Sequence, residues 1–202
     1  LEFRTINGLS ARIIQHYERV KGRQAFTLVT EEGRLAALVG ELYRKATGEF
    51  ATESTVRSLR TAITYCKNRQ MTQEEIEAYQ VEDIPFAKLY RQYHAELRRR
   101  RWMDYDDQMV YAAQILRQHG DILAYFQDKY RYLCVDEAQD TSRIQHTILK
   151  LLAGRRRNLF LVGDEDQSIY GFRAAFPQAL TQFDKGYPDA RVLYLEQNYR
   201  ST

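Results

Sequence analysis

Three short apolar runs in the last part of the chain place the strongest limit on its fold. The runs are YRYLCVDE, NLFLVGDE and RVLYLEQ, and segments of helical length separate them. The first segment, TSRIQHTILKLLAG, ends at Gly154, and the second, AAFPQALTQFDKG, is predicted to be a helical return. Continuous apolar strands that alternate with helices are typical of a parallel sheet covered on both faces. The pattern therefore predicts an α/β fold.

The stretch from about residue 34 to residue 100 follows a different pattern. Its apolar residues recur at helical spacing, as in RLAALVGELY. The segments ATGEFATEST and MTQEE supply breaks, and Thr72 followed by Glu75 fits a capping box. This stretch is predicted to be an all-helical insertion in the α/β fold. Further along, an Asp of the DYDD segment just ahead of the periodic MVYAAQIL is interpreted as an ordinary helix cap.

Composition and charge indicate an ordinary globular protein. Of 202 residues, 44% are hydrophobic and 28% are charged, and the net charge of +3 does not by itself indicate a nucleic-acid binder. The arginine clusters 98–101 and 155–157 fit either solvated faces or contacts with phosphates. Cys66 and Cys134 are expected to be reduced, buried thiols. With no run of about 18 apolar residues and no signal peptide, a cytoplasmic (intracellular) location without membrane contact is expected.

Acidic residues follow two of the predicted strands. Asp136 and Glu137 come directly after YLCV, and Asp164 follows LFLVG. Because ligands gather at the carboxyl ends of parallel strands, these acids are expected at one edge of the sheet. Mg²⁺ prefers carboxylate and phosphate oxygens and would relieve the repulsion between the acids. The sequence therefore predicts a magnesium site, while Asp140 fits equally well as a cap of the next helix, together with the two residues after it.

Several segments together resemble those of one family. VDEAQD resembles the Walker B motif of superfamily 1 helicases, LVGDEDQSIYGFRAA resembles their motif III, and LEQNYRS their motif IV. Their order and intervals are similar to those of the UvrD/Rep/PcrA-type family of ATP-dependent DNA helicases. DYDDQMVYAAQIL and RTINGLSARII also resemble segments that flank the family's core. The resemblance covers most of residues 1–18 and 103–202, and the helical stretch occupies the place of the family's 1B subdomain.

The resemblance implies a domain organisation. Residues 1–18 and 101–202 would form a partial RecA-like motor domain (1A), and residues 19–100 a 1B-like helical insertion. The implied fold is an α/β P-loop NTPase sheet with helices on both faces, but no G-x-x-x-x-G-K-[ST] loop occurs in the sequence. In the family this loop lies upstream and a second motor domain lies downstream. The chain is therefore expected to be a fragment that is inactive alone and acts with the remaining helicase domains in cis.

The resemblance also implies a site for ATP and Mg²⁺. Asp136 and Glu137 would hold the magnesium ion, and Glu137 would polarise the water that attacks the γ-phosphate. Gln167 would reach toward the γ-phosphate, because an amide can both donate and accept hydrogen bonds. Arg200 would stabilise charge in the transition state, and Tyr199 would stack on the adenine.

The DNA contacts implied by the resemblance lie in two places. Tyr170 and Phe172 have the flat faces on which bases of single-stranded DNA stack, whereas an isolated IYGF is more often turn and core packing. Arg173 would reach a phosphate or a neighbouring domain. Thr5 and Asn7 lie where the family contacts the DNA backbone, although NG stands here where HS is common. The expected partners are single-stranded DNA and duplex junctions, and a bacterial protein would be nucleoid-associated.

The implied function is a helicase or translocase that couples ATP hydrolysis to movement along single-stranded DNA and to duplex unwinding. Two other classes stay open. A catalytically inactive DNA-binding module would keep the same fold without turnover. A magnesium-dependent nuclease would also use clustered carboxylates, and PDARVLYLEQN has the acids of one nuclease pattern, but Asn198 replaces its lysine.

Overall fold

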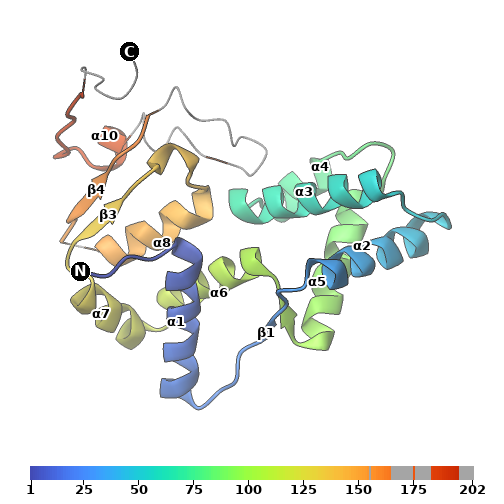
Figure 1. Cartoon of the computed structure of the whole chain (residues 1–202), viewed down its shortest axis with the longest axis horizontal. Coiled ribbons are helices and arrows are strands. Elements are labelled where there is room, and N and C mark those ends of the chain that lie inside the picture. Colours follow the sequence, from blue (N-terminus) through green and yellow to red (C-terminus); the bar gives the residue numbers. More distant parts are fainter. Residues whose placement is uncertain (155, 165–174, 176–182, 196–202) are drawn as a thin grey trace.

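The computed structural model of the chain describes residues 1–154, 156–164, 175 and 183–195. In this part the protein is mostly helical, with two small parallel sheets of two strands each (Figure 1). The predicted mixed α/β class is confirmed in this coarse form. A larger sheet is not present among the described residues.

One group of helices packs around a first apolar core. These helices are α1 (Ile6–Lys21), α6 (Tyr105–Gln118), α7 (Gly120–Lys129) and α8 (Arg143–Ala153). All four contribute side chains to the core, whose fully buried members include Ile13, Leu116, Phe126 and Ile148. The predicted end of the α8 helix is confirmed, because Gly154 is its C-cap.

The small sheet of β3 (Leu133–Val135) and β4 (Leu159–Leu161) lies beside this core (Figure 1). The strands are parallel, with Cys134 opposite Phe160. Leu133 packs against the first core, and the short 3₁₀ helix η1 (Ala138–Asp140) follows β3. Of the predicted helical return, the described residues show α10 (Phe183–Gly186).

A second group of helices forms a separate apolar core (Figure 1). It consists of α2 (Glu32–Thr47), α3 (Glu53–Arg69), α4 (Gln73–Ala78) and α5 (Phe86–Arg100). The predicted capping box at the start of α4 is confirmed: Thr72 Oγ1 accepts the Glu75 N–H at 3.2 Å, and Glu75 Oε2 accepts the Thr72 N–H at 2.7 Å. Sequence periodicity therefore placed this helical stretch correctly.

The two groups of helices are connected by two chain segments that run side by side. The segments are β1 (Thr27–Leu28) and β2 (Trp102–Met103), and they pair in parallel. The chain enters the second group after β1 and returns through β2 into α6, which lies on the side of the first group that faces the second in Figure 1.

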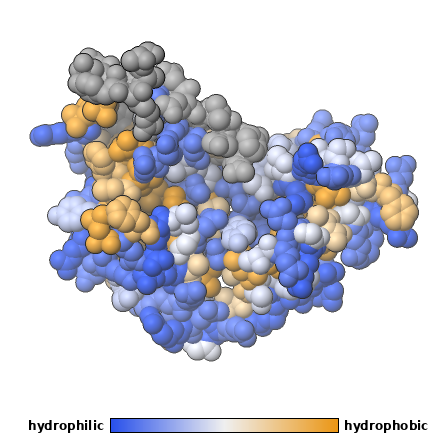
Figure 2. Space-filling model, in the orientation of Figure 1, coloured by the Kyte–Doolittle hydropathy of each residue, from blue (hydrophilic) through white to orange (hydrophobic). Residues whose placement is uncertain are grey.

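Two predictions for this region are wrong for the described residues: the third strand and the burial of Cys134. Residues 191–195 of the third apolar run form no strand, since a strand needs a paired neighbour and not only apolar residues. Phe160 of β4 is 57% exposed, and Figure 2 shows apolar residues at the surface in this region; most of the predicted helical return lies outside the described residues, so the cover of the sheet stays a prediction. Successive strand residues point to opposite faces, so Cys134 is exposed between two partly buried neighbours, whereas Cys66 is buried as predicted.

In the described part of the chain, no helix has the length and apolar character needed to cross a membrane.

Candidate functional site

The acidic residues that follow β3 and β4 lie at one edge of the sheet. The pairing of the strands continues past their ends, because Val162 donates to the Val135 carbonyl at 2.8 Å and Ala138 donates to the Val162 carbonyl at 2.9 Å. Asp136, Glu137 and Asp164 are all exposed at this edge. The structure thus brings the three acids to the same region, where parallel sheets bind ligands.

Glu137 has an unusual backbone conformation. Its φ of 50° and ψ of 43° are left-handed, a region that a residue with a side chain seldom occupies. The Glu137 N–H donates to Asp136 Oδ1 at 3.0 Å, and the Glu137 carbonyl accepts the Asp140 N–H at 3.0 Å. Such strain costs about 1 to 3 kcal/mol and persists where the surroundings specify it. The backbone conformation of Glu137 is therefore specified by its surroundings in the fold.

Gln139 connects Glu137 with the end of β4. Its side chain is almost fully buried, with 1% of the residue exposed. Gln139 Nε2 donates to Glu137 Oε2 at 2.6 Å, and Gln139 Oε1 accepts the Asp164 N–H at 3.1 Å. Sequence analysis missed this residue, because nothing in VDEAQD distinguishes a buried glutamine from a solvated one.

The interpretation of Asp140 as a helix cap is wrong. Ser142 occupies the N-cap of α8, and its backbone N–H donates to Gln145 Oε1 at 2.9 Å, whereas Asp140 ends η1. Within the described residues, Asp140 Oδ1 is buried without a hydrogen-bond partner. Burial, and secondly the charge of Glu137, raise the pKa of Asp140.

The carboxylates at this edge fit a magnesium ion that is held mainly by a bound phosphate and water. No cluster of three or more His, Cys, Asp or Glu side chains among the described residues is arranged to hold a metal. Mg²⁺ in nucleotide sites commonly uses one or two carboxylates together with phosphate oxygens and waters. The exposed carboxylates of Asp136 and Glu137 meet this smaller requirement.

Six predicted site residues lie outside the described residues, and their positions stay predictions. They are Gln167, Tyr170, Phe172, Arg173, Tyr199 and Arg200.

Thr5 and Asn7, the predicted contacts to the DNA backbone, lie at the start of α1. Thr5 is the N-cap of this helix, and its Oγ1 accepts the Gly8 N–H at 3.1 Å. Asn7 lines a cavity of about 690 Å³ that also touches Asp106 and Asp140. Its Oδ1 is buried and has no partner among the described residues. The structure thus gives Thr5 a capping role, and DNA contact by either residue stays a prediction.

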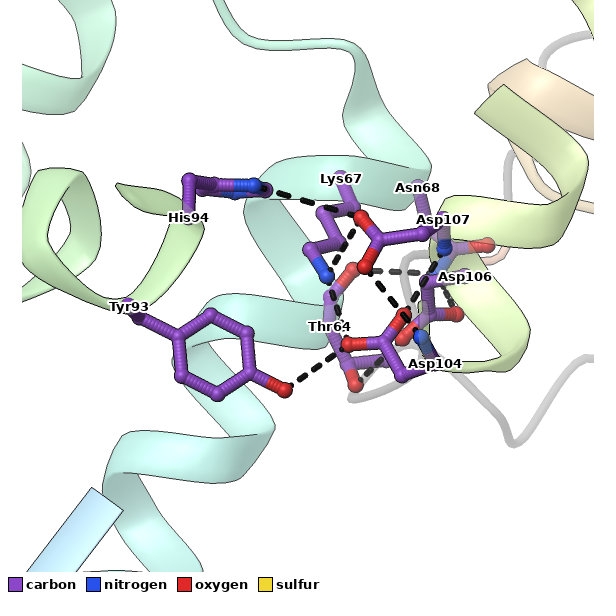
Figure 3. A network of polar contacts seen from close by, with 8 residues as sticks. All are labelled: Thr64, Lys67, Asn68, Tyr93, His94, Asp104, Asp106 and Asp107. Carbon is purple, nitrogen blue, oxygen red and sulfur yellow. Dashed lines mark hydrogen bonds and ion pairs between the residues drawn. The ribbon is translucent and has the colours of Figure 1, made fainter. Parts of the chain in front are cut away.

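A second polar cluster lies between the two groups of helices (Figure 3). We call it the junction network, and its members are Thr64, Lys67, Asn68, Tyr93, His94, Asp104, Asp106 and Asp107. The predicted cap in DYDD is confirmed, because Asp104 Oδ1 accepts the Asp107 N–H at 2.8 Å at the start of α6. Lys67 of α3 reaches Asp104 Oδ2 at 2.5 Å and Asp107 Oδ1 at 2.7 Å.

Other members of the junction network also join the two groups. Tyr93 donates from α5 to Asp104 Oδ2 at 2.9 Å. Thr64 and Asn68 of α3 donate to the two oxygens of Asp106 at 2.8 and 2.7 Å. Sequence analysis missed these partners, although residues 64, 67 and 68 share one face of α3 and a polar face beside an apolar one can mark a buried contact.

Burial and charge shift the pKa values in the junction network. Burial opposes the charge of Lys67, but Asp104 and Asp107 together hold its pKa above the usual value. Burial raises the pKa of Asp107 to about 6, against the opposing effect of Lys67. Burial also resists ionisation of Asp104, but Lys67 lowers its pKa. His94 is neutral at pH 7, because burial and then Lys67 lower its pKa to about 4.

Most described arginines of the two clusters are engaged within the protein. Arg99 and Arg100 pair with Glu96, and Arg101 donates to the Gln24 carbonyl. In the second cluster, the pairs are Arg156 with Asp128 and Arg157 with Asp189. These arginines thus have partners within the protein, which fits solvated faces. None of these contacts tests whether the clusters also bind phosphates.

Comparison with known proteins identifies relatives over most of the chain. The family model described as "UvrD/REP helicase N-terminal domain" matches residues 1–188. The "ATP-dependent DNA helicase PcrA" of Staphylococcus epidermidis is 41% identical over 143 residues, which are 70% of this chain and 20% of that protein. The protein of the same name from Staphylococcus aureus is 41% identical over 145 residues, again 70% of this chain and 20% of that protein. The chain thus spans about a fifth of the length of these relatives.

The extent of the family match agrees with the resemblance found in the sequence motifs. The chain belongs to the UvrD/REP helicase family.

Proposed function

We propose that the protein carrying this chain is an ATP-dependent DNA helicase that couples ATP hydrolysis to movement along single-stranded DNA and to duplex unwinding. Family membership supports the reaction class. The observation that carries the proposal is that Asp136, Glu137 and Asp164 lie exposed at one edge of a parallel sheet, with the backbone of Glu137 in a constrained conformation. Catalysis of phosphoryl transfer is mostly positioning and charge stabilisation, which such an edge can provide.

In this proposal the carboxylates have different roles. Asp136 would hold Mg²⁺, with Glu137 beside it, and the bound ion would neutralise charge on the phosphates. Glu137 would accept a proton from the attacking water. Its Oε2 already accepts a hydrogen bond from Gln139 Nε2 at 2.6 Å, and this bond would orient the carboxylate before substrate binds.

The remaining contacts to the nucleotide and to DNA complete the proposal. Gln167 and Arg200 would contact the γ-phosphate, and Tyr199 would stack on adenine. Tyr170 and Phe172 would stack on bases of single-stranded DNA. Phosphate contacts would come from Arg173, Thr5 and Asn7.

We also propose that residues 1–18 and 101–202 form part of a motor domain and that residues 19–100 form an inserted helical subdomain. The presence of two separate apolar cores supports this division. The paired segments β1 and β2 would then be the two crossings between the units.

The test is the substitution Glu137→Gln in the full-length protein that contains this chain. The variant keeps the size of the side chain but cannot accept a proton. We expect nucleotide affinity to stay within about twofold and DNA-stimulated ATP hydrolysis to fall by at least about 100-fold, the range of a lost proton acceptor. The matched control is Glu82→Gln, since Glu82 is also exposed and left-handed, with a φ of 48°.

The same preparations separate the two alternatives from the proposal. Wild-type protein that binds DNA but does not hydrolyse ATP would support the inactive module. Magnesium-dependent cutting of plasmid DNA without ATP would support the nuclease. Unchanged hydrolysis in Glu137→Gln would remove Glu137 from the mechanism.

A further inference from the structure

The side chain of Gln139 makes hydrogen bonds on both sides of the candidate site. Its Nε2 donates to the Glu137 carboxylate at 2.6 Å, and its Oε1 accepts the backbone N–H of Asp164 at 3.1 Å. Glu137 follows β3, and Asp164 follows β4. The amide therefore spans the ends of the two strands.

The chemistry of the two contacts fixes the orientation of the amide. A carboxylate can only accept and a backbone N–H can only donate, so the NH₂ group must face Glu137 and the oxygen must face Asp164. Gln139 is buried, with 1% of the residue exposed, and water cannot easily replace either contact. Losing a partner for a buried polar group costs about 1 to 3 kcal/mol, so the two contacts are coupled through one side chain.

The position of Glu137 makes this support important. Its backbone is held in the left-handed region, which a residue with a side chain seldom occupies, and the residue is exposed. Among the hydrogen bonds of the described residues, the bond from Gln139 is the one that engages the Glu137 carboxylate. The amide of Gln139 thus determines where this carboxylate lies in the absence of ligands.

We propose that Gln139 is a positioning residue that holds the Glu137 carboxylate and ties its location to the segment that leaves β4 at Asp164. The role rests on the proposed function of Glu137 as the proton acceptor. A displacement of Asp164 would shift the glutamine and, with it, the carboxylate. The position of the Glu137 carboxylate after β3 would therefore depend on the position of Asp164 after β4.

Two substitutions separate positioning from simple stability. Gln139→Met fills a similar volume but removes both hydrogen bonds. Gln139→Glu keeps the acceptor for Asp164 and places a second carboxylate beside Glu137. Two adjacent carboxylates share a proton, so the pKa that controls activity rises.

The expected kinetic results differ for the two variants. For Gln139→Met, kcat of DNA-stimulated hydrolysis falls about 10- to 100-fold, because a displacement near 1 Å can have such an effect, while KM for ATP changes less than about threefold. For Gln139→Glu, the acidic limb of the pH–rate profile moves to higher pH by at least about one unit. This movement of the limb tests whether residue 139 lies beside the Glu137 carboxylate, and the fall in kcat of Gln139→Met tests the positioning role.

Hydrogen exchange of the Asp164 amide, followed by NMR without nucleotide, tests the bridge independently of activity. Exchange should be at least about tenfold faster in Gln139→Met and close to wild type in Gln139→Glu. The control Gln145→Met loses the contact to the Ser142 N–H at 2.9 Å, and it should lower stability without changing the Asp164 amide or the pH limb.

The outcomes distinguish this inference from the proposed function. If Glu137→Gln retains turnover, the proposed function fails. If Glu137→Gln is inactive while Gln139→Met keeps wild-type kcat and a protected Asp164 amide, only the positioning role is wrong. Should Gln139→Met fail to fold, the isosteric Gln139→Glu decides: it removes the donor to Glu137, so a wild-type kcat in that variant also overturns the positioning role.

Discussion

At the scale of single residues, Lys67 is a buried charged side chain whose ammonium group needs compensating charges around it. It is 3% exposed, and its ammonium group lies between the carboxylates of Asp104 and Asp107. Burying such ions costs several kcal/mol each, and the geometry must offset this cost. Removing the cation alone would leave carboxylates buried without compensation. The network therefore depends on keeping its charges balanced.

Protonation of Asp107 provides a test of this balance through the pH dependence of stability. Because the folded protein raises the pKa of Asp107 to about 6, above the unfolded value, the folded state binds the proton more tightly. The contribution of Asp107 is thus fully present below about pH 4 and is lost as pH rises toward 6. His94 and His146, whose pKa values burial lowers to about 4, act in the opposite direction in the same range.

We therefore expect the difference in unfolding free energy between wild type and Asp107→Asn to depend on pH. The wild type should lose up to about 1.4 kcal/mol per pH unit relative to the variant as pH rises from 4 to 6. Urea denaturation at a series of pH values measures this difference. A constant difference across the range would show that Asp107 titrates with an ordinary pKa. Asp121→Asn, at an exposed position in α7, is the control.

At the scale of secondary-structure elements, local rules predicted most helices and the parallel strands β3 and β4, but not the extent of the sheet. The caps at Thr72 and Asp104 and the stop at Gly154 depend on nearby residues, and all three are present in the structure. The run at residues 191–195 depends on a neighbouring strand to pair with, and it forms none. Long-range contacts, which a single sequence does not reveal, decide such cases.

In the candidate site, too, local sequence patterns predicted some features and long-range contacts determine the others. The positions of Asp136 and Glu137 at a strand end follow from local patterns, and the structure places both at that edge. The bridge by Gln139 and the partners of Lys67 depend on segments that are far apart in the sequence, such as residue 164 and residue 104. Their pairing requires the folded arrangement of strands and helices.

The first turn of α1 offers a prediction at the element scale. Thr5 Oγ1 caps the helix at 3.1 Å from the Gly8 nitrogen, so Thr5→Ala should lower the unfolding free energy by about 1 kcal/mol. Thr5→Asn supplies another good cap and should restore most of this loss. Thermal unfolding measures the cap, and fluorescence anisotropy with labelled single-stranded DNA measures any contact to the backbone.

The two readouts separate the roles of Thr5. If Thr5 only caps α1, Thr5→Asn binds DNA like wild type. If the hydroxyl also contacts a phosphate, Thr5→Asn is stable but binds more weakly. Equal stability of Thr5→Ala and wild type would contradict the capping role.

At the scale of the whole molecule, two apolar cores are joined mainly by polar contacts. The two clusters have no residue in common. Between them lie the junction network, the paired β1 and β2, and a hydrogen bond from Gln70, the C-cap of α3, to Thr147 of α8 at 2.7 Å. Interfaces between domains of one chain are often polar, and such an interface allows each domain to unfold locally without the other. The two cores should therefore behave as separate cooperative units.

Core substitutions in each unit test this independence. Leu59 lies in the second core and Ile148 in the first, and both are 0% exposed. Leu59→Ala should cost about 2 to 5 kcal/mol of local stability and accelerate hydrogen exchange in α2, α3 and α5, while α1, α6 and α8 keep their protection. Ile148→Ala should produce the reverse pattern. Exchange that accelerates equally in all six helices for either variant would mean that the polar junction makes the two cores one cooperative unit.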